Sequence, residues 1–502
     1  MSYRNITYHP RDELIRLFTW DEEGNRIVVE HTYNPYLYVE INDIAKASGT
    51  SLFKTPVKKL EFRTQFDRLR YIKENNLTRV FENISCTQQF LIDRYWETNE
   101  SPDFSKNPLK MVLVDIETYS SDGSFPNIEQ ANHPINVITI YDSLSKRYIT
   151  WGAKEYTCKD TQHTYYHCPN ESKLLSGFLG YLQQDYPDII SGWNSHGFDI
   201  PYIITRCRNL LGDDVKQLSP VGNIYSRTFP GDFGKQVIRW FVDGVSLLDY
   251  LDIYKRFAPE RESYKLDNIA QLEIGESKVK FNNMDLFDLA ENDWETFIDY
   301  NLQDVKILVK LEEKLQYLGL VRMLAYVGLT SFEAAMGSLS VINGAIVIRG
   351  RQRNQIIPTF IRNEPDHTNP GAYVAVPKRG FQECVVSYDA NSLYPNVIIS
   401  LNLSPETKVG KIVTKNDTSF EIRLVNGKLK IIEKDVFDKF CKEHEIAVTK
   451  ADVLFSQKEK GIIPEIVDYY YQRRTDVKND YIKKKKELAA IEAKIKKIQL
   501  KK

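Results

Sequence analysis

Two carboxylates stand two residues apart in the apolar segment V-L-V-D-I-E-T. Asp115 and Glu117 share one face if this segment is a β-strand, because side chains alternate between the two faces of a strand. Hard divalent cations such as Mg²⁺ prefer carboxylate and water oxygens, and two such ions can cleave a phosphodiester by activating a water and stabilising the leaving oxygen. An acidic pair on a solvated strand edge is the alternative that this segment leaves open.

Two later segments carry groups that suit the same chemistry. In S-G-W-N-S-H-G-F-D-I-P-Y-I, Asn194 and Asp199 lie in a glycine-containing loop before a predicted helix, whose start favours an anion. A simple helix N-cap is the alternative role of Asp199. Tyr300 and Asp304 are four residues apart and share one face of a helix, where a phenol could orient a metal-bound water. Such pairs are also common on ordinary surface helices.

A further carboxylate lies in V-V-S-Y-D-A-N-S-L-Y-P-N-V-I-I-S. We expect an apolar strand over residues 384–388, and Asp389 follows it directly, before a turn and a helix. A carboxylate in this place could hold a catalytic metal ion. A capped helix with a core tyrosine at Tyr394 is the alternative.

The elements that must position these groups follow from the apolar patterning. Alternation over residues 14–20 and 27–29 predicts a β-hairpin, and residues 36–41 predict another strand. Residues 101–109 are expected to be a linker. From residue 111 to about 315 strands and helices alternate, and helical periodicity continues over 320–349 and 463–502.

Composition limits the class of protein. At 502 residues, with 42% hydrophobic and 27% charged residues, the chain should form several globular domains. It has no apolar stretch long enough to span a bilayer and no signal peptide, so we expect a cytoplasmic protein, in the bacterial host cytoplasm if viral. Six dispersed cysteines indicate free thiols. The net charge of −1 hides a basic end, because residues 471–502 hold 12 Lys and Arg against 4 Asp and Glu.

The three acidic segments together form the D-x-E, N-x-x-x-F-D and Y-x-x-x-D set, which resembles proofreading 3′→5′ exonucleases of the DEDDy type. The whole chain resembles the family B DNA polymerases, with a pattern similar to the replicative polymerases of T-even-type bacteriophages. The resemblance implies that two Mg²⁺ or Mn²⁺ ions are held by Asp115, Glu117, Asp199 and Asp304. It also implies that Tyr300 positions the attacking water.

The same resemblance assigns roles outside these segments. The run F-V-D-G-V-S-L-L-D-Y-L-D-I-Y-K-R-F resembles the part that follows the family's exonuclease hairpin, which helps to separate primer from template. Phe125 could touch an unpaired 3′ end, with packing as the alternative. The segment P-G-A-Y-V-A-V-P-K-R-G resembles the family's connection between exonuclease and palm.

The last third of the chain resembles the first palm motif and the start of the fingers. This resemblance makes Asp389 a catalytic ligand in part of a two-ion polymerase site, and assigns Ser392 and Leu393 to the nucleotide site. It places Tyr394 beneath the deoxyribose, where it excludes a 2′-hydroxyl. In Y-Y-Y-Q-R-R-T-D-V-K, Arg473 is the residue expected to meet the triphosphate, with Arg474 as its neighbour.

The chain departs from the family pattern in two places, because it contains neither K-x-x-x-N-S-x-Y-G nor Y-x-D-T-D. We therefore expect a polymerase that assembles from two polypeptides, with a truncated chain as the alternative. The expected partners are DNA primer–templates, single-stranded DNA 3′ ends, deoxynucleoside triphosphates and a C-terminal polymerase chain. A sliding clamp and a single-stranded DNA-binding protein would act through that assembly, and no membrane is expected. The alternative functions are a stand-alone DNA exonuclease and an RNA-binding translational regulator.

The expected fold is multidomain, α/β and α+β, with a β-rich N-terminal domain and a ribonuclease H-like exonuclease domain. The predicted ranges are 1–106 for the N-terminal domain, 107–316 for the exonuclease, 317–360 for a helical second part of the N-terminal domain, 361–458 for a partial palm and 459–502 for the start of helical fingers. A zinc site at Cys158, His163, His167 and Cys168 is a competing hypothesis. It is disfavoured because no C-x-x-C pair is present and the resembling family has no zinc there.

Overall fold

The structure is a computed structural model that describes residues 3–10, 12–98, 104, 106–119, 126–158, 160–231, 236–278, 286–360 and 373–499. Contacts divide the chain into two compact units. The first comprises Met1–Pro35, Glu61–Tyr71 and Ile84–Gly344, and the second comprises Tyr36–Leu60, Ile72–Asn83 and Ala345–Lys502. The five domain ranges expected from the sequence remain predictions.

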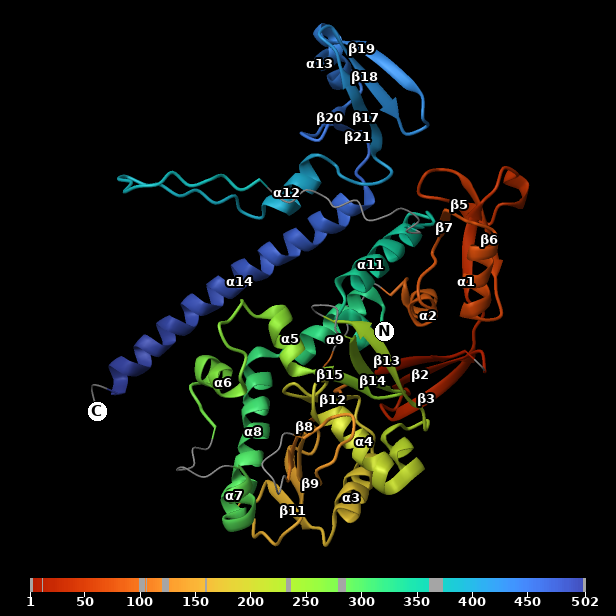
Figure 1. Ribbon diagram of the computed structural model, residues 1–502. Coiled ribbons are helices and arrows are strands. Elements are labelled where there is room, and N and C mark those ends of the chain that lie inside the picture. The colour runs from red at the N-terminus through yellow and green to blue at the C-terminus, as the bar shows by residue number, and fades with distance from the viewer. Residues whose placement is uncertain are drawn as a thin grey trace. The chain divides into compact units, whose positions relative to one another are not determined.

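A six-stranded mixed sheet forms the centre of the first unit (Figure 1). Its order is β11-β10-β9-β8-β12-β15. Strand β8 is antiparallel to β9 and parallel to β12, and β12 is parallel to β15. The strands are β8 (Met111–Thr118), β9 (Ile135–Asp142), β10 (Arg147–Gly152), β11 (His163–His167), β12 (Ile189–Gly192) and β15 (Ser246–Asp249). The buried strand predicted from M-V-L-V-D-I-E is confirmed as β8.

Helices cover both faces of this sheet (Figure 1). Val112, Val114 and Ile116 of β8 join a core with α3 (Glu171–Gln184) and α4 (Asp199–Leu211). On the opposite face, a smaller core joins β9 to α7 (Leu286–Asn292) and α8 (Trp294–Leu315). The alternation of β8 therefore buries its even-numbered residues against α3 and α4 and turns Asp115 and Glu117 towards α8.

A three-stranded sheet, a two-stranded hairpin and several helices complete the first unit. Strand β2 (Leu14–Trp20) pairs with β1 (Asn5–His9) and with β3 (Arg26–Thr32), which confirms the predicted N-terminal hairpin. A second antiparallel pair joins β13 (Ile224–Pro230) to β14 (Gln236–Val242). Helices α1 (Gln65–Glu74) and α11 (Ser338–Gln352) each continue into the second unit. The other helices of this unit are, in order, α1, α2 (Cys86–Tyr95), α5 (Tyr250–Phe257), α6 (Leu266–Ile274), α9 (Tyr317–Gly328), α10 (Phe332–Ala335) and α11. The last three confirm the helical periodicity predicted after residue 320.

The second unit contains two five-stranded sheets, ordered β16-β7-β4-β6-β5 and β19-β18-β17-β21-β20. The first confirms the predicted strand near residue 36 as β4 (Tyr36–Glu40). Its other strands are β5 (Gly49–Thr50), β6 (Pro56–Glu61), β7 (Arg79–Phe81) and β16 (Pro358–Phe360). The second consists of β17 (Lys408–Lys415), β18 (Ser419–Leu424), β19 (Leu429–Glu433), β20 (Ile446–Val448) and β21 (Val453–Ser456), and helix α13 (Lys434–Glu443) packs on it.

Two helices carry the sequence segments that resemble palm and fingers. Helix α12 (Leu393–Ser400) packs against α14 (Ile462–Gln499), the long basic helix that the sequence predicted (Figure 1). The predicted strand over residues 384–388 is wrong, because these residues have no regular structure. Val385 and Val386 are 76% and 69% exposed there. An apolar run becomes a buried strand only when neighbouring strands pair with it, and no described strand pairs with this one.

None of the helices in the described part of the chain combines enough length and apolar character to cross a membrane.

Candidate active site

Three carboxylates converge between strand β8 and helix α8. Asp115, Glu117 and Asp304 each offer a carboxylate oxygen, and these oxygens lie within 4.8 Å of one another. The side chains of Asp115 and Glu117 are partly buried, and Asp304 is only 3% exposed. The predicted common face for the two strand acids is therefore observed, and the helix brings the third acid to the same place.

Asp199 reaches the site from the first turn of α4. Its carboxylate is buried, and Oδ1 accepts a hydrogen bond of 3.2 Å from the backbone N–H of Ile116, between the two strand acids. The residue before the helix, Phe198, makes no side-chain cap, so Asp199 does not act as the N-cap that was its alternative role. The bond to β8 fixes the start of α4 beside Asp115 and Glu117.

Lysine 278 lies among these acids. Its ammonium nitrogen lies 3.1 Å from the hydroxyl oxygen of Tyr300 and forms an ion pair with Asp304 Oδ2. Tyr300 and Asp304 are one turn apart on α8, as their spacing predicted. The ammonium group of Lys278 therefore connects the phenol of Tyr300 to the carboxylate cluster.

Asn301 links the same helix to the strand. Its Nδ2 donates to Asp115 Oδ2 at 2.6 Å, and the residue is fully buried. The sequence analysis missed both Asn301 and Lys278. Asn301 could have been found, because it lies three residues before Asp304 and so shares its helix face. Nothing in the spacing around Lys278 sets it apart from other lysines.

Burial and mutual repulsion favour the protonated acids when no cation is bound. Burial, followed by repulsion from Asp304, raises the pKa of Glu117 to about 8. Burial is also the main cause that raises the pKa of Asp199 to about 7 and holds the pKa of Asp115 well above its ordinary value. Burial raises the pKa of Asp304 as well, although Lys278 partly offsets this effect. Four acids held this close need positive charge to ionise together.

The cluster opens into a cavity of about 760 Å³. The cavity is lined by Asp115, Trp193, Asn194, Leu251, Tyr264, Lys265, Leu266, Asp267, Lys278 and Asp304. Asp304 Oδ1 is buried and has no hydrogen-bond partner in the described part of the chain. Convergent carboxylate oxygens, one of them unsatisfied, fit the oxygen-rich coordination that Mg²⁺ and Mn²⁺ prefer. The residues present therefore suit divalent cations.

The residues predicted for nucleotide binding lie in the other compact unit. Asp389 is exposed, Ser392 has a φ of 50° before α12, and Leu393 and Tyr394 are 53% and 77% exposed. Arg473 is exposed on α14. Among the described residues, no metal-capable group includes Asp389. The structure places these residues on two packed helices and the segment before them.

Three other sequence hypotheses have different outcomes. The zinc hypothesis finds no support. Among the described residues, Cys158, His163, His167 and Cys168 belong to no cluster of three or more side chains that could hold a metal ion. His163 is buried, and its Nε2 lies 2.9 Å from Thr150 Oγ1. Phe125 lies outside the described residues, as do the first three residues of P-G-A-Y-V-A-V-P-K-R-G.

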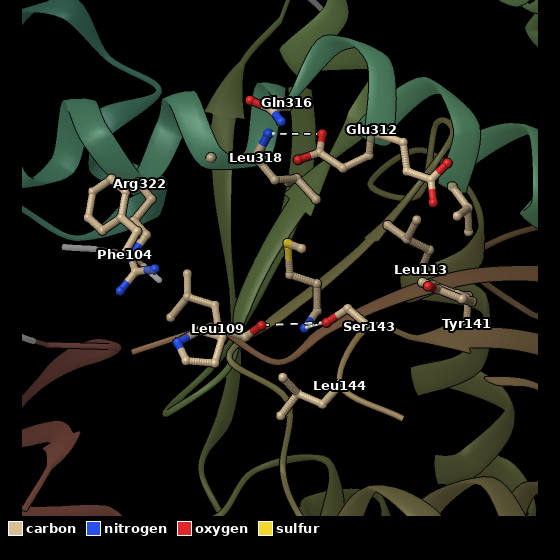
Figure 2. A pocket seen from close by; sticks show the side chains of 15 residues that line it. Phe104, Leu109, Leu113, Tyr141, Ser143, Leu144, Glu312, Gln316, Leu318 and Arg322 are labelled. Atoms are coloured by element: carbon tan, nitrogen blue, oxygen red, sulfur yellow. Dashed lines mark hydrogen bonds between the residues drawn. The ribbon is translucent and has the colours of Figure 1, made fainter. Parts of the chain in front are cut away.

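A second cavity, of about 430 Å³, lies where strand β8 begins (Figure 2). Its lining is mainly apolar and includes Leu109, Leu113, Leu144 and Leu318, with Arg322 at one side. Glu312 at its edge accepts hydrogen bonds from Tyr250 and from the backbone N–H of Leu318. None of the predicted site residues lines this cavity.

Comparison with known proteins agrees with the geometry. Residues 65–269 match the exonuclease domain of DNA polymerase family B, and residues 335–501 match DNA polymerase family B itself. The first match includes Asp115, Glu117 and Asp199 but ends before Lys278, Tyr300 and Asp304.

Individual relatives are DNA polymerases. The DNA-directed DNA polymerase of Escherichia phage RB69 is 26% identical over 485 residues, which cover 90% of this chain and 51% of that protein. The DNA-directed DNA polymerase of Enterobacteria phage T4 is 27% identical over 74% of this chain and 42% of its own length. DNA polymerase 1 of Pyrococcus abyssi is 24% identical over 78% of this chain. The chain spans about half the length of these relatives. With both of the family's domains matched in the family's order, the chain belongs to the family B DNA polymerases.

Proposed function

We propose that the first unit is a 3′→5′ DNA exonuclease of the DEDDy type that removes nucleotides from DNA 3′ ends. The observation that carries this proposal is the convergence of Asp115, Glu117 and Asp304 on one point, where none of the described residues offers Asp304 Oδ1 a hydrogen-bond partner. Asp199 completes the four acids, and its bond to β8 keeps it beside them. The family match supports a DNA substrate.

Divalent cations bound by the four acids would activate a water and stabilise the oxygen that leaves the terminal phosphodiester. The chain contributes orientation and proton control. Burial, followed by the charge of Asp304, raises the pKa of Tyr300 to about 12, so the phenol stays protonated at neutral pH. Lys278 donates hydrogen bonds to the phenol oxygen of Tyr300 and to Asp304, which fixes the hydroxyl of Tyr300 at the edge of the cluster. Tyr300 therefore orients the water and does not take its proton.

The test compares Asp115→Ala with the natural chain on 5′-labelled single-stranded DNA and Mg²⁺. The natural chain should give products that shorten from the 3′ end, and the variant should lose this activity by a factor of about a hundred to ten thousand. Asp213→Ala is the matched control, because the Asp213 side chain is 90% exposed outside the cavity. Unchanged degradation by Asp115→Ala would falsify the exonuclease assignment.

A second proposal concerns polymerisation, which the family match and the palm-like segment favour. We propose that Asp389, Ser392, Leu393, Tyr394 and Arg473 form part of a deoxynucleotide site that another polypeptide completes. Two-metal nucleotidyl transfer needs ligands on both ions, and Asp389 is the one acid that the palm-like segment supplies. The packing of α12 against α14 supports a common role for Tyr394 and Arg473.

Primer extension with the purified chain, alone and mixed with a candidate C-terminal polymerase polypeptide, tests this second proposal. Extension should require both polypeptides and should be lost in Asp389→Asn. Extension by this chain alone would show that it contains a complete polymerase site.

A further inference from the structure

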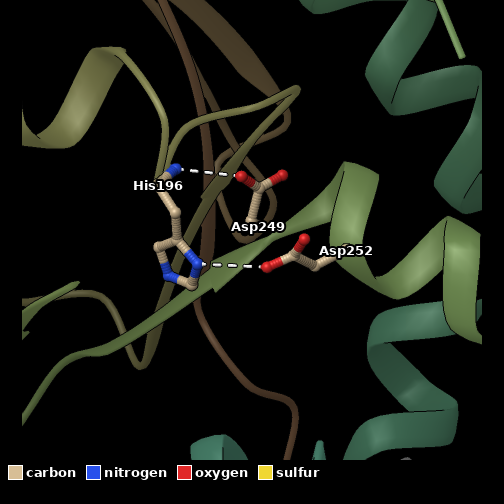
Figure 3. A group of neighbouring side chains, drawn as sticks. All are labelled: His196, Asp249 and Asp252. Atoms are coloured by element: carbon tan, nitrogen blue, oxygen red, sulfur yellow. Dashed lines mark hydrogen bonds and ion pairs between the residues drawn. The ribbon is translucent and has the colours of Figure 1, made fainter. Parts of the chain in front are cut away.

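A group of three titratable side chains lies next to the proposed active site but outside it. His196, Asp249 and Asp252 point towards one another (Figure 3). His196 belongs to the loop between β12 and α4, whereas Asp249 ends β15 and Asp252 lies in the first turn of α5. The same loop carries Asn194, which lines the cavity, and leads directly into Asp199. The group can therefore affect the position of an active-site acid.

Asp249 fixes the backbone of this loop. Its Oδ1 accepts a hydrogen bond of 3.0 Å from the N–H of Asn194, and its Oδ2 accepts one of 2.9 Å from the N–H of His196. The same carboxylate caps α5 by accepting from the N–H of Leu251 at 2.9 Å. Asp249 is 3% exposed, so water competes little for these bonds. One buried carboxylate thus ties the loop to the start of α5.

The ring of His196 continues the connection. Nε2 lies 3.2 Å from the carbonyl oxygen of Leu247, and since a carbonyl only accepts, Nε2 carries a proton. Nδ1 faces Asp252 Oδ2 at 3.5 Å. The same Asp252 oxygen accepts from Arg239 Nη2 at 3.1 Å. Asp252 therefore lies between the loop and strand β14.

Arg239 brings the β13–β14 hairpin into this connection. Phe229, Val237 and Ile238 of the hairpin are 39%, 42% and 48% exposed, so the hairpin offers apolar side chains to a ligand. Bases of single-stranded DNA stack on aromatic rings such as that of Phe229, and an arginine on the same hairpin attracts phosphate. DNA that moves the hairpin would pull on Asp252 through Arg239.

We propose that Arg239, Asp252 and His196 form a positioning relay, through which contact between the β13–β14 hairpin and DNA sets the placement of the loop that carries Asn194 and Asp199. The relay rests on the proposed exonuclease function. None of its three residues touches the reacting atoms, and each acts through the loop.

The test uses Arg239→Gln with Arg227→Gln as a matched control. Arg227 faces Arg239 across the hairpin and lies over the rings of Tyr225 and Phe241. The Arg227→Gln variant therefore removes the same positive charge from the same hairpin. Hydrogen exchange of the backbone N–H groups in residues 193–198 reports the loop without any need for activity. Arg239→Gln should accelerate this exchange, and Arg227→Gln should leave it at the natural rate.

Exonuclease kinetics provide the second readout. Arg239→Gln and Asp252→Asn should each lower kcat about threefold to thirtyfold, and the double variant should lose no more than the stronger single variant. Arg239→Lys should recover most of the loss, and Arg227→Gln should change KM alone. Thermal unfolding of each variant identifies any that fails to fold, in which case Arg239→Lys and His196→Gln carry the comparison.

The two hypotheses can fail separately. Equal exchange in Arg239→Gln and Arg227→Gln, or additive losses in the double variant, would overturn the relay. A natural chain that releases no nucleotide would remove the exonuclease proposal, while the exchange experiment would still report whether the hairpin controls the loop.

Discussion

The ammonium nitrogen of Lys278 lies 3.1 Å from the hydroxyl oxygen of Tyr300 and pairs with Asp304, one of the three acids that converge in the site. Burial alone would lower the pKa of this ammonium, but Asp304 and Tyr300 raise it above its ordinary value, so the lysine stays charged. It therefore combines two roles: it partly neutralises Asp304 and it fixes the phenol oxygen. Both roles lead to predictions about turnover.

Replacing Lys278 with Gln should lower kcat of the exonuclease about tenfold to a hundredfold, because Tyr300 loses the bond that orients its hydroxyl. KM for single-stranded DNA should change little. Steady-state kinetics on a labelled oligonucleotide measure both constants. Lys310→Gln is the control, since Lys310 lies on α8, the helix of Tyr300, and pairs with Glu276 outside the cluster. A change confined to KM would show that Lys278 binds DNA and does not orient Tyr300.

Replacing Asn301 with Ala should release Asp115 from α8. The lost bond is 2.6 Å long and buried, so we expect a loss of about 1 to 3 kcal/mol in stability. Activity should fall about tenfold at low Mg²⁺ and recover partly at high Mg²⁺, because Asp115 keeps its carboxyl group as a metal ligand but loses its fixed orientation. Gln303→Ala, on the same helix, should change neither the stability nor the Mg²⁺ dependence of the activity. Activity that is independent of Mg²⁺ concentration in both variants would contradict this role.

The acids also predict how stability depends on pH when no cation is present. Glu117 has a pKa raised from 4.5 to about 8, and Asp199 a pKa raised from 3.8 to about 7. An acid with a higher pKa in the folded state holds its proton more tightly when folded. Stability is therefore greatest below the unfolded pKa and falls as pH rises towards the folded pKa.

Thermal unfolding in EDTA should accordingly show a Tm that falls between about pH 5 and about pH 8. Mg²⁺ should remove most of this fall, because it binds the ionised acids. Glu117→Gln should reduce the slope in EDTA. A metal-free Tm that rises over the same interval would contradict the assignment of the buried acids.

The sequence predicted best where periodicity and chemistry agree. The alternation of β8 placed Asp115 and Glu117 on one face, and the spacing of Tyr300 and Asp304 placed both on one helix face. Lys278 was not predictable, because its role arises only when residues distant in sequence meet. The strand expected over residues 384–388 failed for the opposite reason: its apolar pattern needs a partner strand, and none of the described strands supplies one.

Glycine 192 allows the close approach of β12 to β8 just before the loop that carries Asn194. A Cβ at this position would lie 2.5 Å from the backbone oxygen of Val114. Gly192→Ala should therefore cost about 1 to 3 kcal/mol in the free energy of unfolding and should lower exonuclease activity. Gly180→Ala, in α3 with no atom within 4 Å of the added Cβ, should stabilise the chain by about 0.5 to 1 kcal/mol. Chemical denaturation measures the free energy of unfolding of both variants. An equal change in Gly192→Ala and Gly180→Ala would contradict the close packing of β12 on β8.

The central claim is that Asp115, Glu117, Asp199 and Asp304 form a site for two divalent cations. Isothermal titration of the natural chain and of Asp304→Asn with Mn²⁺ tests it most directly, because binding is measured without DNA or turnover. The account predicts about two ions per natural chain and the loss of at least one in the variant. Equal Mn²⁺ binding by the two proteins, or no binding to the natural chain at millimolar Mn²⁺, would contradict it.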